Sequence, residues 1–268
     1  MKKVLIIIVF LVLMVLVFAL MGRAQEKDKM SAKEIVETSY HLYRQGVKTE
    51  KEKMDLDIMH GESQTEKKQL VKWTQYEEKR KDKVFIEFTS PNIDKGLKLL
   101  VHRQENEDMI WMKLPSLSRD RRISGQDEGN YFAETDLTYR DTAQLAGEAT
   151  EEYNYHFVET DDPLSDGPNV KWTIKAEPKE DTDAIYGHRI FFVTKDFVIA
   201  GIKYFDSNGD IIKVQVNKKI VQDKNGRWRT DKIIIENRYY NRTTEIEVTK
   251  RDYNNDQAPS FSRRDLRR

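Results

Sequence analysis

Apolar and polar residues alternate along most of the chain after Gly46. In one run Met54, Leu56 and Ile58 are separated by aspartates, and the pattern recurs at 84–88, 212–216 and 244–248. A period of two indicates half-buried strands with one polar face. About ten or eleven such strands follow at short spacing with no helical period between them, which predicts a meandering antiparallel sheet.

Turn residues separate the predicted strands. Asn208 and Gly209 both tolerate positive φ angles and favour a type I′ hairpin turn. Asn225 and Gly226 form a second signal of the same kind. The segment 161–168 is rich in Asp, Pro and Gly, and it predicts a longer surface loop.

The sequence predicts two helices. Ser31 and Glu34 form a capping box, in which each side chain accepts a hydrogen bond from the other residue's amide. Apolar residues then recur at helical spacing on one face, and Gly46 is a natural stop. A second, short helix is expected within 136–145. The fold class is therefore mainly β with added helices (α+β).

The N-terminus has the pattern of an export signal. Lys2 and Lys3 precede the apolar run Val4–Met21, and cleavage between Ala24 and Gln25 is expected. The run is longer than a usual signal core, so an uncleaved membrane anchor remains the alternative. The sequence thus divides into a leader (1–24), one large domain (25–253) and a polar, basic tail (254–268). We expect that tail to pack loosely or fray, with Phe261 and Leu266 as its apolar anchors.

Composition narrows the chemistry. The chain has 268 residues and no cysteine, so it has no disulfide, thiolate nucleophile or acylated N-terminal cysteine. Its 46 basic and 46 acidic residues are dispersed, which gives no field favouring nucleic acid. Its five histidines show no metal-ligand spacing. We expect no metal, no cofactor and no nucleic-acid partner.

Motifs of catalysis are missing from the sequence. There is no G-x-S-x-G elbow, no phosphate-binding G-x-x-x-x-G-K-[ST] loop and no dinucleotide-binding G-x-G-x-x-G turn. A pair of carboxylates could still form an acid/base site, since carboxylates are abundant. The sequence favours a protein that is not an enzyme, with a lipid or glycan hydrolase as an alternative.

The segment Lys95–Leu145 carries the most specific pattern. A W-x-x-L-P-x-L-x-x-x-R-R-I strand and turn precede D-L-T-Y-x-D. The matching positions are Trp111, Leu114, Pro115, Leu117, Arg121, Arg122, Ile123, Asp136, Leu137, Thr138, Tyr139 and Asp141. In this order the segment resembles the periplasmic lipoprotein-carrier superfamily, the LolA/LolB-like proteins, and above all its outer-membrane lipoprotein-sorting branch. Members often carry a Gly shortly before the first Asp, where this chain has Glu134 and Thr135.

The resemblance implies an architecture and a function. It implies a single antiparallel sheet curled into an incomplete β-barrel, with an apolar concave face covered by helices. It also implies a monomeric periplasmic carrier, with lipoprotein or other lipid as cargo and an inner-membrane transporter as donor. Two non-enzymatic alternatives remain: a module that senses lipoproteins or another partner, and a membrane-anchored accessory subunit of an inner-membrane exporter.

Apolar and aromatic residues are the candidates for ligand binding. In 109–114 both strand faces are apolar, so a helix covers one face or that face meets a ligand. An acyl chain needs only such a surface. Candidates for the lining or its lid are Trp73, Trp111, Met112, Leu114, Phe132, Leu137 and Tyr139. Ordinary core packing is the alternative for each of them.

A basic turn follows the same strand. Arg119, Arg121 and Arg122 could form a docking patch for a lipid head group or a partner protein. They could equally form a solvated turn in which Asp120 is the local partner.

Overall fold

The computed structural model describes residues 30–61, 64–78, 81–104, 108–145, 147–180 and 182–267. The proposed leader, with its expected cleavage site between Ala24 and Gln25, lies outside the described residues. The first described residue, Met30, stands immediately before the predicted capping box.

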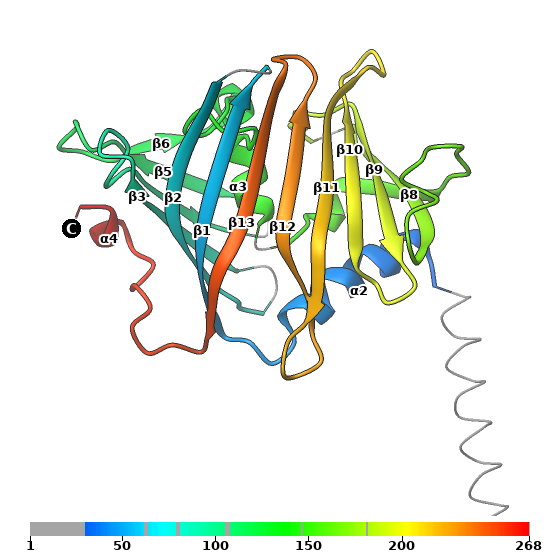
Figure 1. Cartoon of the computed structure of the whole chain (residues 1–268), viewed down its shortest axis with the longest axis horizontal. Coiled ribbons are helices and arrows are strands. Elements are labelled where there is room, and N and C mark those ends of the chain that lie inside the picture. Colours follow the sequence, from blue (N-terminus) through cyan, green and yellow to red (C-terminus); the bar gives the residue numbers. More distant parts are fainter. Residues whose placement is uncertain are drawn as a thin grey trace, which may run out of the picture.

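Thirteen described strands form one antiparallel sheet, in the order β6-β5-β4-β3-β2-β1-β13-β12-β11-β10-β9-β8-β7 (Figure 1). They are β1 (Thr49–His60), β2 (Gln64–Gln75), β3 (Lys83–Ser90), β4 (Lys98–His102), β5 (Met109–Lys113), β6 (Arg121–Ile123), β7 (Tyr153–Phe157), β8 (Val170–Pro178), β9 (His188–Thr194), β10 (Ile199–Phe205), β11 (Ile211–Gln222), β12 (Trp228–Asn237) and β13 (Arg242–Tyr253). The sheet curls without closing, because β6 and β7 remain separate edges. The predicted antiparallel sheet is confirmed. Its strands outnumber the ten or eleven expected, since pieces as short as the three residues of β6 show no period.

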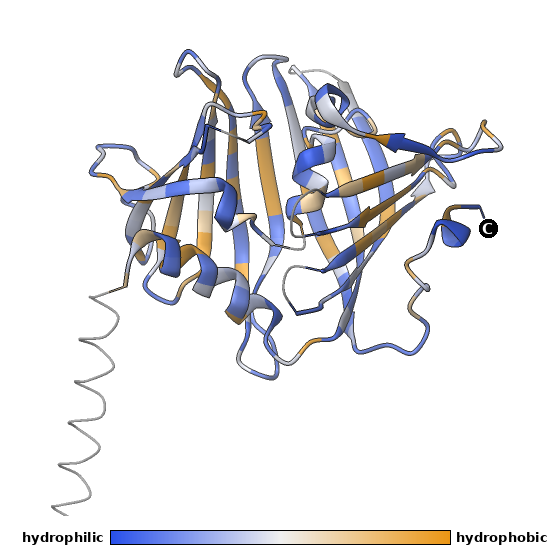
Figure 2. Cartoon of the chain, turned by 180° about the vertical axis from the view of Figure 1, so that it is seen from behind, coloured by the Kyte–Doolittle hydropathy of each residue, from blue (hydrophilic) through white to orange (hydrophobic). Residues whose placement is uncertain are grey.

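The described helices lie on both sides of the sheet. They are α2 (Ala32–Arg44), α3 (Tyr139–Gln144) and α4 (Arg263–Arg267), with 3-10 turns η1 (Gly125–Gly129) and η2 (Thr150–Glu152). The predicted capping box at the start of α2 is present: Ser31 Oγ accepts from the Glu34 amide, and Glu34 Oε2 accepts from the Ser31 amide at 2.7 Å. Seen from behind, α2 and α3 cover the concave side of the sheet (Figure 2).

The turn between β10 and β11 differs from the type I′ prediction. Gly209 has a φ of 88°, whereas Asn208 does not have a positive φ. The carboxylate of Asp206 explains the difference, because its Oδ1 accepts from the amides of Asn208 and Asp210, both at 2.9 Å. This side-chain turn needs only one left-handed residue. The turn that begins at Asp223 repeats the arrangement.

Two apolar clusters lie on the concave side. One lies over β1–β6, β12 and β13 and is closed by α3 and the loop before it; the other lies over β7–β10 and is closed by α2. The first includes Leu56, Phe88, Leu99, Ile110, Phe132 and Ile246, and the second includes Ile35, Val36, Trp172, Phe191, Ile202 and Tyr204. The helices therefore cover an apolar surface that the sheet could not bury alone.

A polar stripe on β11 separates the two clusters. Lys213, Gln215 and Asn217 face the concave side, and Lys213 is only 1% exposed. The alternation in this strand correctly predicted one apolar face and one polar face. However, the apolar face that includes Val214 and Val216 is turned away from the cavity lining. The polar residues are inside because each finds a partner there.

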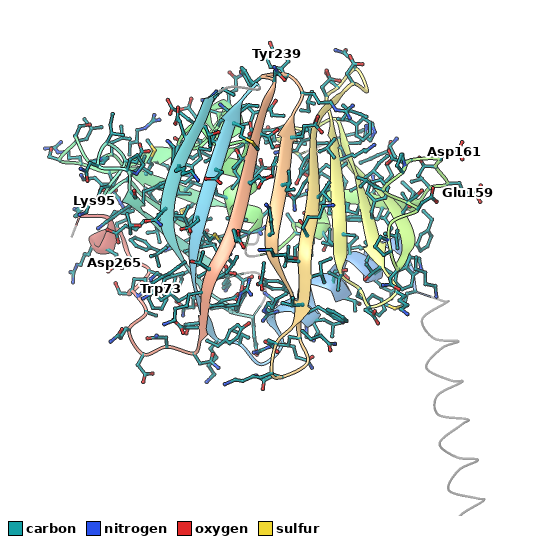
Figure 3. All side chains as sticks on the ribbon, in the orientation of Figure 1. Trp73, Lys95, Glu159, Asp161, Tyr239 and Asp265 are labelled. Carbon is teal, nitrogen blue, oxygen red and sulfur yellow. The ribbon has the colours of Figure 1, made fainter. Side chains whose placement is uncertain are left out.

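The C-terminal tail packs on the convex side of the sheet. Phe261 and Leu266 are 3% and 1% exposed, and they form a third cluster with Trp73, Phe85 and Leu100. Figure 3 shows Trp73 and Asp265 on this side of the molecule. The expectation of a loose or frayed tail is therefore wrong for the described residues up to 267, because both apolar anchors are fully buried.

Ionic contacts reinforce the tail. The Arg263 and Arg267 Nε atoms donate to the Asp120 carboxylate at 2.7 and 2.8 Å. His102 Nε2 lies 2.7 Å from the Phe261 carbonyl oxygen. Asp120 therefore pairs with the tail, whereas the sequence suggested the neighbouring basic turn as its partner.

Both aspartates of the D-L-T-Y-x-D segment anchor α3 to the sheet. Asp136 accepts from Arg242 Nε at 2.8 Å and from the Thr244 hydroxyl at 2.7 Å. Asp141 accepts from Lys213 Nζ at 2.5 Å. Burial lowers the pKa of Lys213, and the Asp141 carboxylate acts in the opposite direction.

The other end of α3 is held by two arginines. Arg103 Nη1 donates to the carbonyl oxygen of Ala143 at 3.0 Å. Arg189 makes a two-point ion pair with Glu148, at 2.9 and 2.5 Å, and both side chains are 1% exposed. The short helix predicted within 136–145 is confirmed, and it is fixed over the sheet at both ends.

Replacing Asp141 should test this anchor. Asp141→Asn leaves the buried Lys213 ammonium without its counter-charge, so we expect the free energy of unfolding in urea to fall by about 3 kcal/mol. Asp127→Asn is the control, because Asp127 is 56% exposed and 3.9 Å from Arg121, and it should cost less than about 0.5 kcal/mol. Equal losses in the two variants would contradict the anchoring role.

A second substitution should test the packing of the tail. Leu266→Ala should lower the free energy of unfolding by about 2–4 kcal/mol, since it empties a buried site. The control Leu117→Ala changes a side chain in a residue that is 47% exposed, and it should leave the urea midpoint nearly unchanged. A tail that was only loosely attached would make the two variants indistinguishable.

Candidate functional site

A cavity of about 690 Å³ lies between the concave face of the sheet, α2 and α3. Its size falls within the range of small-molecule sites in proteins. Apolar side chains from both clusters line it: Met54, Leu56, Leu70, Ile86, Phe88, Phe132, Leu137, Leu145, Phe197, Val198, Ile199, Ile202, Ile233, Ile246 and Val248. The curvature of the sheet creates this space, because the two clusters meet their own helices but not each other.

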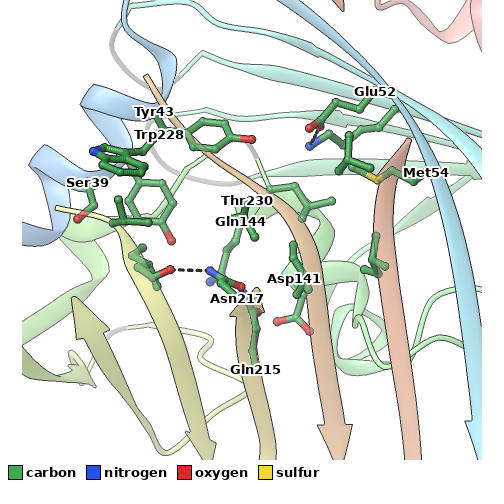
Figure 4. A pocket seen from close by; sticks show the side chains of 18 of the residues that line it. Ser39, Tyr43, Glu52, Met54, Asp141, Gln144, Gln215, Asn217, Trp228 and Thr230 are labelled. Atoms are coloured by element: carbon green, nitrogen blue, oxygen red, sulfur yellow. Dashed lines mark hydrogen bonds and ion pairs between the residues drawn. The ribbon is translucent and has the colours of Figure 1, made fainter. Parts of the chain in front are cut away.

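The mouth of the cavity lies beside α2. Lining residues there are exposed, among them Leu42 and Gln45 on the helix side and Asn225 and Gly226 in the β11–β12 turn. Figure 4 shows Ser39, Tyr43 and Trp228 together at this side of the cavity. Arg227 Nη1 donates to the Gln45 carbonyl oxygen at 3.1 Å, which ties the turn to the end of α2.

A buried ion-pair network forms one polar part of the wall. Glu52 forms ion pairs with Lys72 Nζ at 2.5 Å and with Arg251 Nη2 at 2.8 Å. Burial would raise the pKa of Glu52, but Lys72 and Arg251 outweigh it and hold that pKa below its usual value. Burial and the Glu52 charge raise the pKa of the neighbouring Glu50.

The second polar part is the β11 stripe with the residues facing it. Gln215 and Asn217 line the cavity from the sheet, and Gln144 and Asp141 line it from α3 (Figure 4). The site therefore combines a long apolar surface with a few amide groups placed near its middle. Such a combination suits a molecule with a hydrocarbon part and a small polar part.

Two of the seven apolar candidates line the cavity, namely Phe132 and Leu137. Three more belong to the same apolar cluster without lining the cavity. Met112 and Tyr139 are 4% and 7% exposed, with the Tyr139 hydroxyl donating to Met112 Sδ at 3.1 Å. Leu114 packs against them.

Trp73 and Trp111 lie elsewhere, on the convex side under the C-terminal tail. Because Met112 points inward on β5, its neighbour Trp111 must point outward. There its ring meets His102 edge-on at 5.1 Å and lies 6.0 Å from the Arg263 guanidinium. These two tryptophans stabilise the attached tail and do not reach the cavity.

The three candidate docking arginines are exposed, and none lines the cavity. Arg121 and Arg122 belong to β6, and Arg119 lies in the turn before it. The ion pair of Arg121 with Asp127 is long, at 3.9 Å, and exposed. Their docking role stays a prediction.

Sequence reasoning missed most of the polar lining. Gln215 and Asn217 lie in a strand whose apolar face was expected to turn inward, and Glu52 and Lys72 lie in strands that read as ordinarily solvated on their polar side. The only available signal was indirect: Asn217 belongs to a residue type that is depleted in strands, yet it lies within a strand of strong alternation.

The loop before Asp136 keeps a conformation that suits glycine. Ala133 and Glu134 have φ angles of 52° and 61°. Glu134 thus has the left-handed backbone that a Gly would adopt without strain. Its carboxylate lies 3.6 Å from Lys68 Nζ, an ion pair that a Gly could not make.

Two kinds of feature are absent from the described residues. No group of three or more His, Cys, Asp or Glu is placed to hold a metal ion there. Within the same ranges, no helix has the length and apolar character needed to cross a membrane.

Comparisons of the sequence identify a protein family but no curated relative. A protein-family model described as "Uncharacterized protein" matches residues 80–268. No curated protein matches the sequence significantly.

Three solved structures are similar over nearly their whole length. A domain from Vibrio parahaemolyticus named for outer-membrane lipoprotein sorting has a TM-score of 0.79 and 19% identity, and the match covers 88% of this chain and 98% of that domain. A DUF1329 family protein from Desulfovibrio piger has a TM-score of 0.73 and 20% identity, and the match covers 86% of this chain and 98% of that protein. A LolA superfamily protein from Nitrosomonas europaea has a TM-score of 0.64 and 13% identity, and the match covers 86% of this chain and 96% of that protein. The chain thus has the LolA-like fold, and it belongs to the protein family whose model matches residues 80–268.

Proposed function

We propose that the protein is an exported, non-enzymatic carrier that binds the acyl chains of lipoproteins or other lipids in its cavity. The cavity of about 690 Å³ beneath the curled sheet carries this proposal. Two similar structures support it by their names, one for outer-membrane lipoprotein sorting and one for the LolA superfamily. The proposed place of action is the periplasm, and an inner-membrane transporter is the proposed donor for the monomeric carrier.

The energetics suit reversible binding. Burial of one methylene gains about 0.8 kcal/mol, so a tail of ten methylenes gains about 8 kcal/mol before losses. Loss of translational and rotational freedom removes a large part of that gain. The resulting moderate affinity fits a carrier that must release its cargo, because very tight binding would prevent delivery.

We place entry and release at the mouth beside α2. The opposite cover, α3, is held by the Asp141–Lys213 ion pair and by Arg189, which donates to Gln144 and pairs with Glu148 just beyond the helix. These contacts make it a poor moving lid. The β11–β12 turn is exposed and meets α2 through Arg227 and the Gln45 carbonyl. A small displacement of this turn would widen the mouth without breaking a buried ion pair.

A matched pair of variants tests binding in the cavity. Ile233 lines it, whereas the next residue, Ile234, does not. Ile233→Trp fills the cavity and should weaken binding of an apolar fluorescent probe by at least about tenfold, which corresponds to 1.4 kcal/mol. Ile234→Trp places the same group on the other strand face and should bind the probe as the unchanged protein does.

The unfolding midpoints of both variants complete this test. If both remain folded and bind the probe equally well, the cavity is not where apolar ligands bind. If the unchanged protein binds no probe or lipid, a module that senses a protein partner becomes the better account.

A separate experiment tests export. The protein recovered from the periplasmic fraction of producing cells should begin at Gln25, because a signal peptidase selects small residues such as Ala24. N-terminal sequencing gives this start directly. Recovery in the membrane fraction with the apolar run Val4–Met21 still attached would contradict the proposed free carrier and favour the anchored accessory subunit.

A further inference from the structure

The polar stripe gives the cavity a hydrogen-bonding centre between two apolar halves. The hydroxyl of Tyr204 donates to Gln215 Oε1 at 3.1 Å, and Gln215 Nε2 donates to Asn217 Oδ1 at 3.0 Å. Asn217 Nδ2 then donates to the Ile199 carbonyl oxygen at 2.7 Å. This chain fixes the orientation of both amides. Each amide nitrogen has a second hydrogen, and each amide oxygen has a second lone pair, available to a guest.

A third amide approaches from the opposite wall. Gln144, on α3, accepts from Arg189 Nη1 through Oε1 at 3.2 Å. That contact leaves its Nε2 as the outward donor, and this nitrogen has no hydrogen-bond partner among the described residues. Gln144 lines the same cavity as Gln215 and Asn217, and Figure 4 shows all three among its lining side chains. Donors and acceptors therefore face the hollow from both sides.

The cations around this centre are already paired with carboxylates. Asp141 is paired with Lys213 at 2.5 Å, and Glu52 is paired with Lys72 at 2.5 Å. At the mouth, Arg227 is paired with its own turn through Asp223 at 2.7 Å. Among the described lining residues, then, no cation lacks a counter-charge.

An anionic group at the stripe would meet an unfavourable environment. It would lose its water and lie close to the Asp141 carboxylate, and it could gain a cation only by breaking an existing ion pair. An uncharged hydroxyl, ester or amide avoids both costs. It can also bond to Gln215, Asn217 and Gln144.

We infer that the cavity selects acyl ligands whose polar part is uncharged and carries hydroxyl and carbonyl groups, as in an acylglycerol. This inference rests on the proposed carrier function. It adds the position of the polar part, next to Asn217, and the exclusion of free fatty-acid anions. The hydrocarbon tail then runs from the stripe over one apolar cluster.

Competition with a bound probe tests this selectivity. An apolar fluorescent probe such as N-phenylnaphthylamine is displaced at neutral pH by either monolauroylglycerol or laurate, which share one tail and differ in charge. The glyceride should displace the probe at a concentration about tenfold lower than laurate does. Equal or better displacement by laurate would overturn the selectivity for neutral ligands.

Variants of the stripe locate the selectivity. Gln215→Met and Asn217→Leu keep the side-chain volume but remove the amides, so the preference for the glyceride should shrink to within about twofold. Lys218→Leu is the control on the same strand, since Lys218 is exposed and outside the lining, and it should keep the full preference. Gln144→Met gives an independent variant from the other wall.

The outcomes separate two failures. If the probe binds and both competitors displace it equally, the neutral-ligand inference fails while the carrier proposal stands. If folded protein binds neither probe nor competitor, both fail. A preference for the glyceride that survives in all three stripe variants would place the polar part of the ligand elsewhere and contradict the inference.

Discussion

The fixed position of α3 over the concave face is the constraint on which the cavity depends. A curled sheet with an apolar inner surface would be more stable if its covering elements moved inward and filled the hollow, because more apolar surface would then be buried. Asp136 and Asp141 prevent this at one end of the segment, since each binds a cation of the sheet. Arg103 and Arg189 hold the other end. Ion pairs at both ends therefore fix the position of the helix over the sheet, while Tyr139 and Ala143 make its apolar contacts.

The same contacts explain why the D-L-T-Y-x-D segment is a structural device as much as a family signature. Its two carboxylates face the sheet, and its Tyr139 ring fills the apolar cluster beneath the helix. The capping hydrogen bond from the Asp141 amide to the Thr138 hydroxyl starts the helix at the correct residue. One short segment thus starts α3, attaches it to the sheet and forms one side of the cavity.

Sequence patterns predicted the fold class, the capping box, the short helix and the antiparallel sheet because these depend on neighbouring residues. They failed where distant residues decide. The alternation in β11 has the same form whichever face turns inward, and the choice is made by Lys213 meeting Asp141, 72 residues away. Trp73 and Trp111 were expected at the cavity because nothing in their strands shows that the chain returns, through Phe261 and Leu266, to cover the convex side. The apolar residues on both faces of 109–114 did predict that something covers each face, because α4 covers the convex face of this strand.

Carriage of lipid requires that an acyl chain can occupy the space between α3 and the sheet. Native mass spectrometry of the protein purified gently from the cell envelope is the decisive measurement. We expect a population of folded monomer that carries one extra species of lipid mass, which dissociates on collisional activation. A folded monomer that is always free of lipid, even after incubation with envelope lipids, would rule out the carrier function.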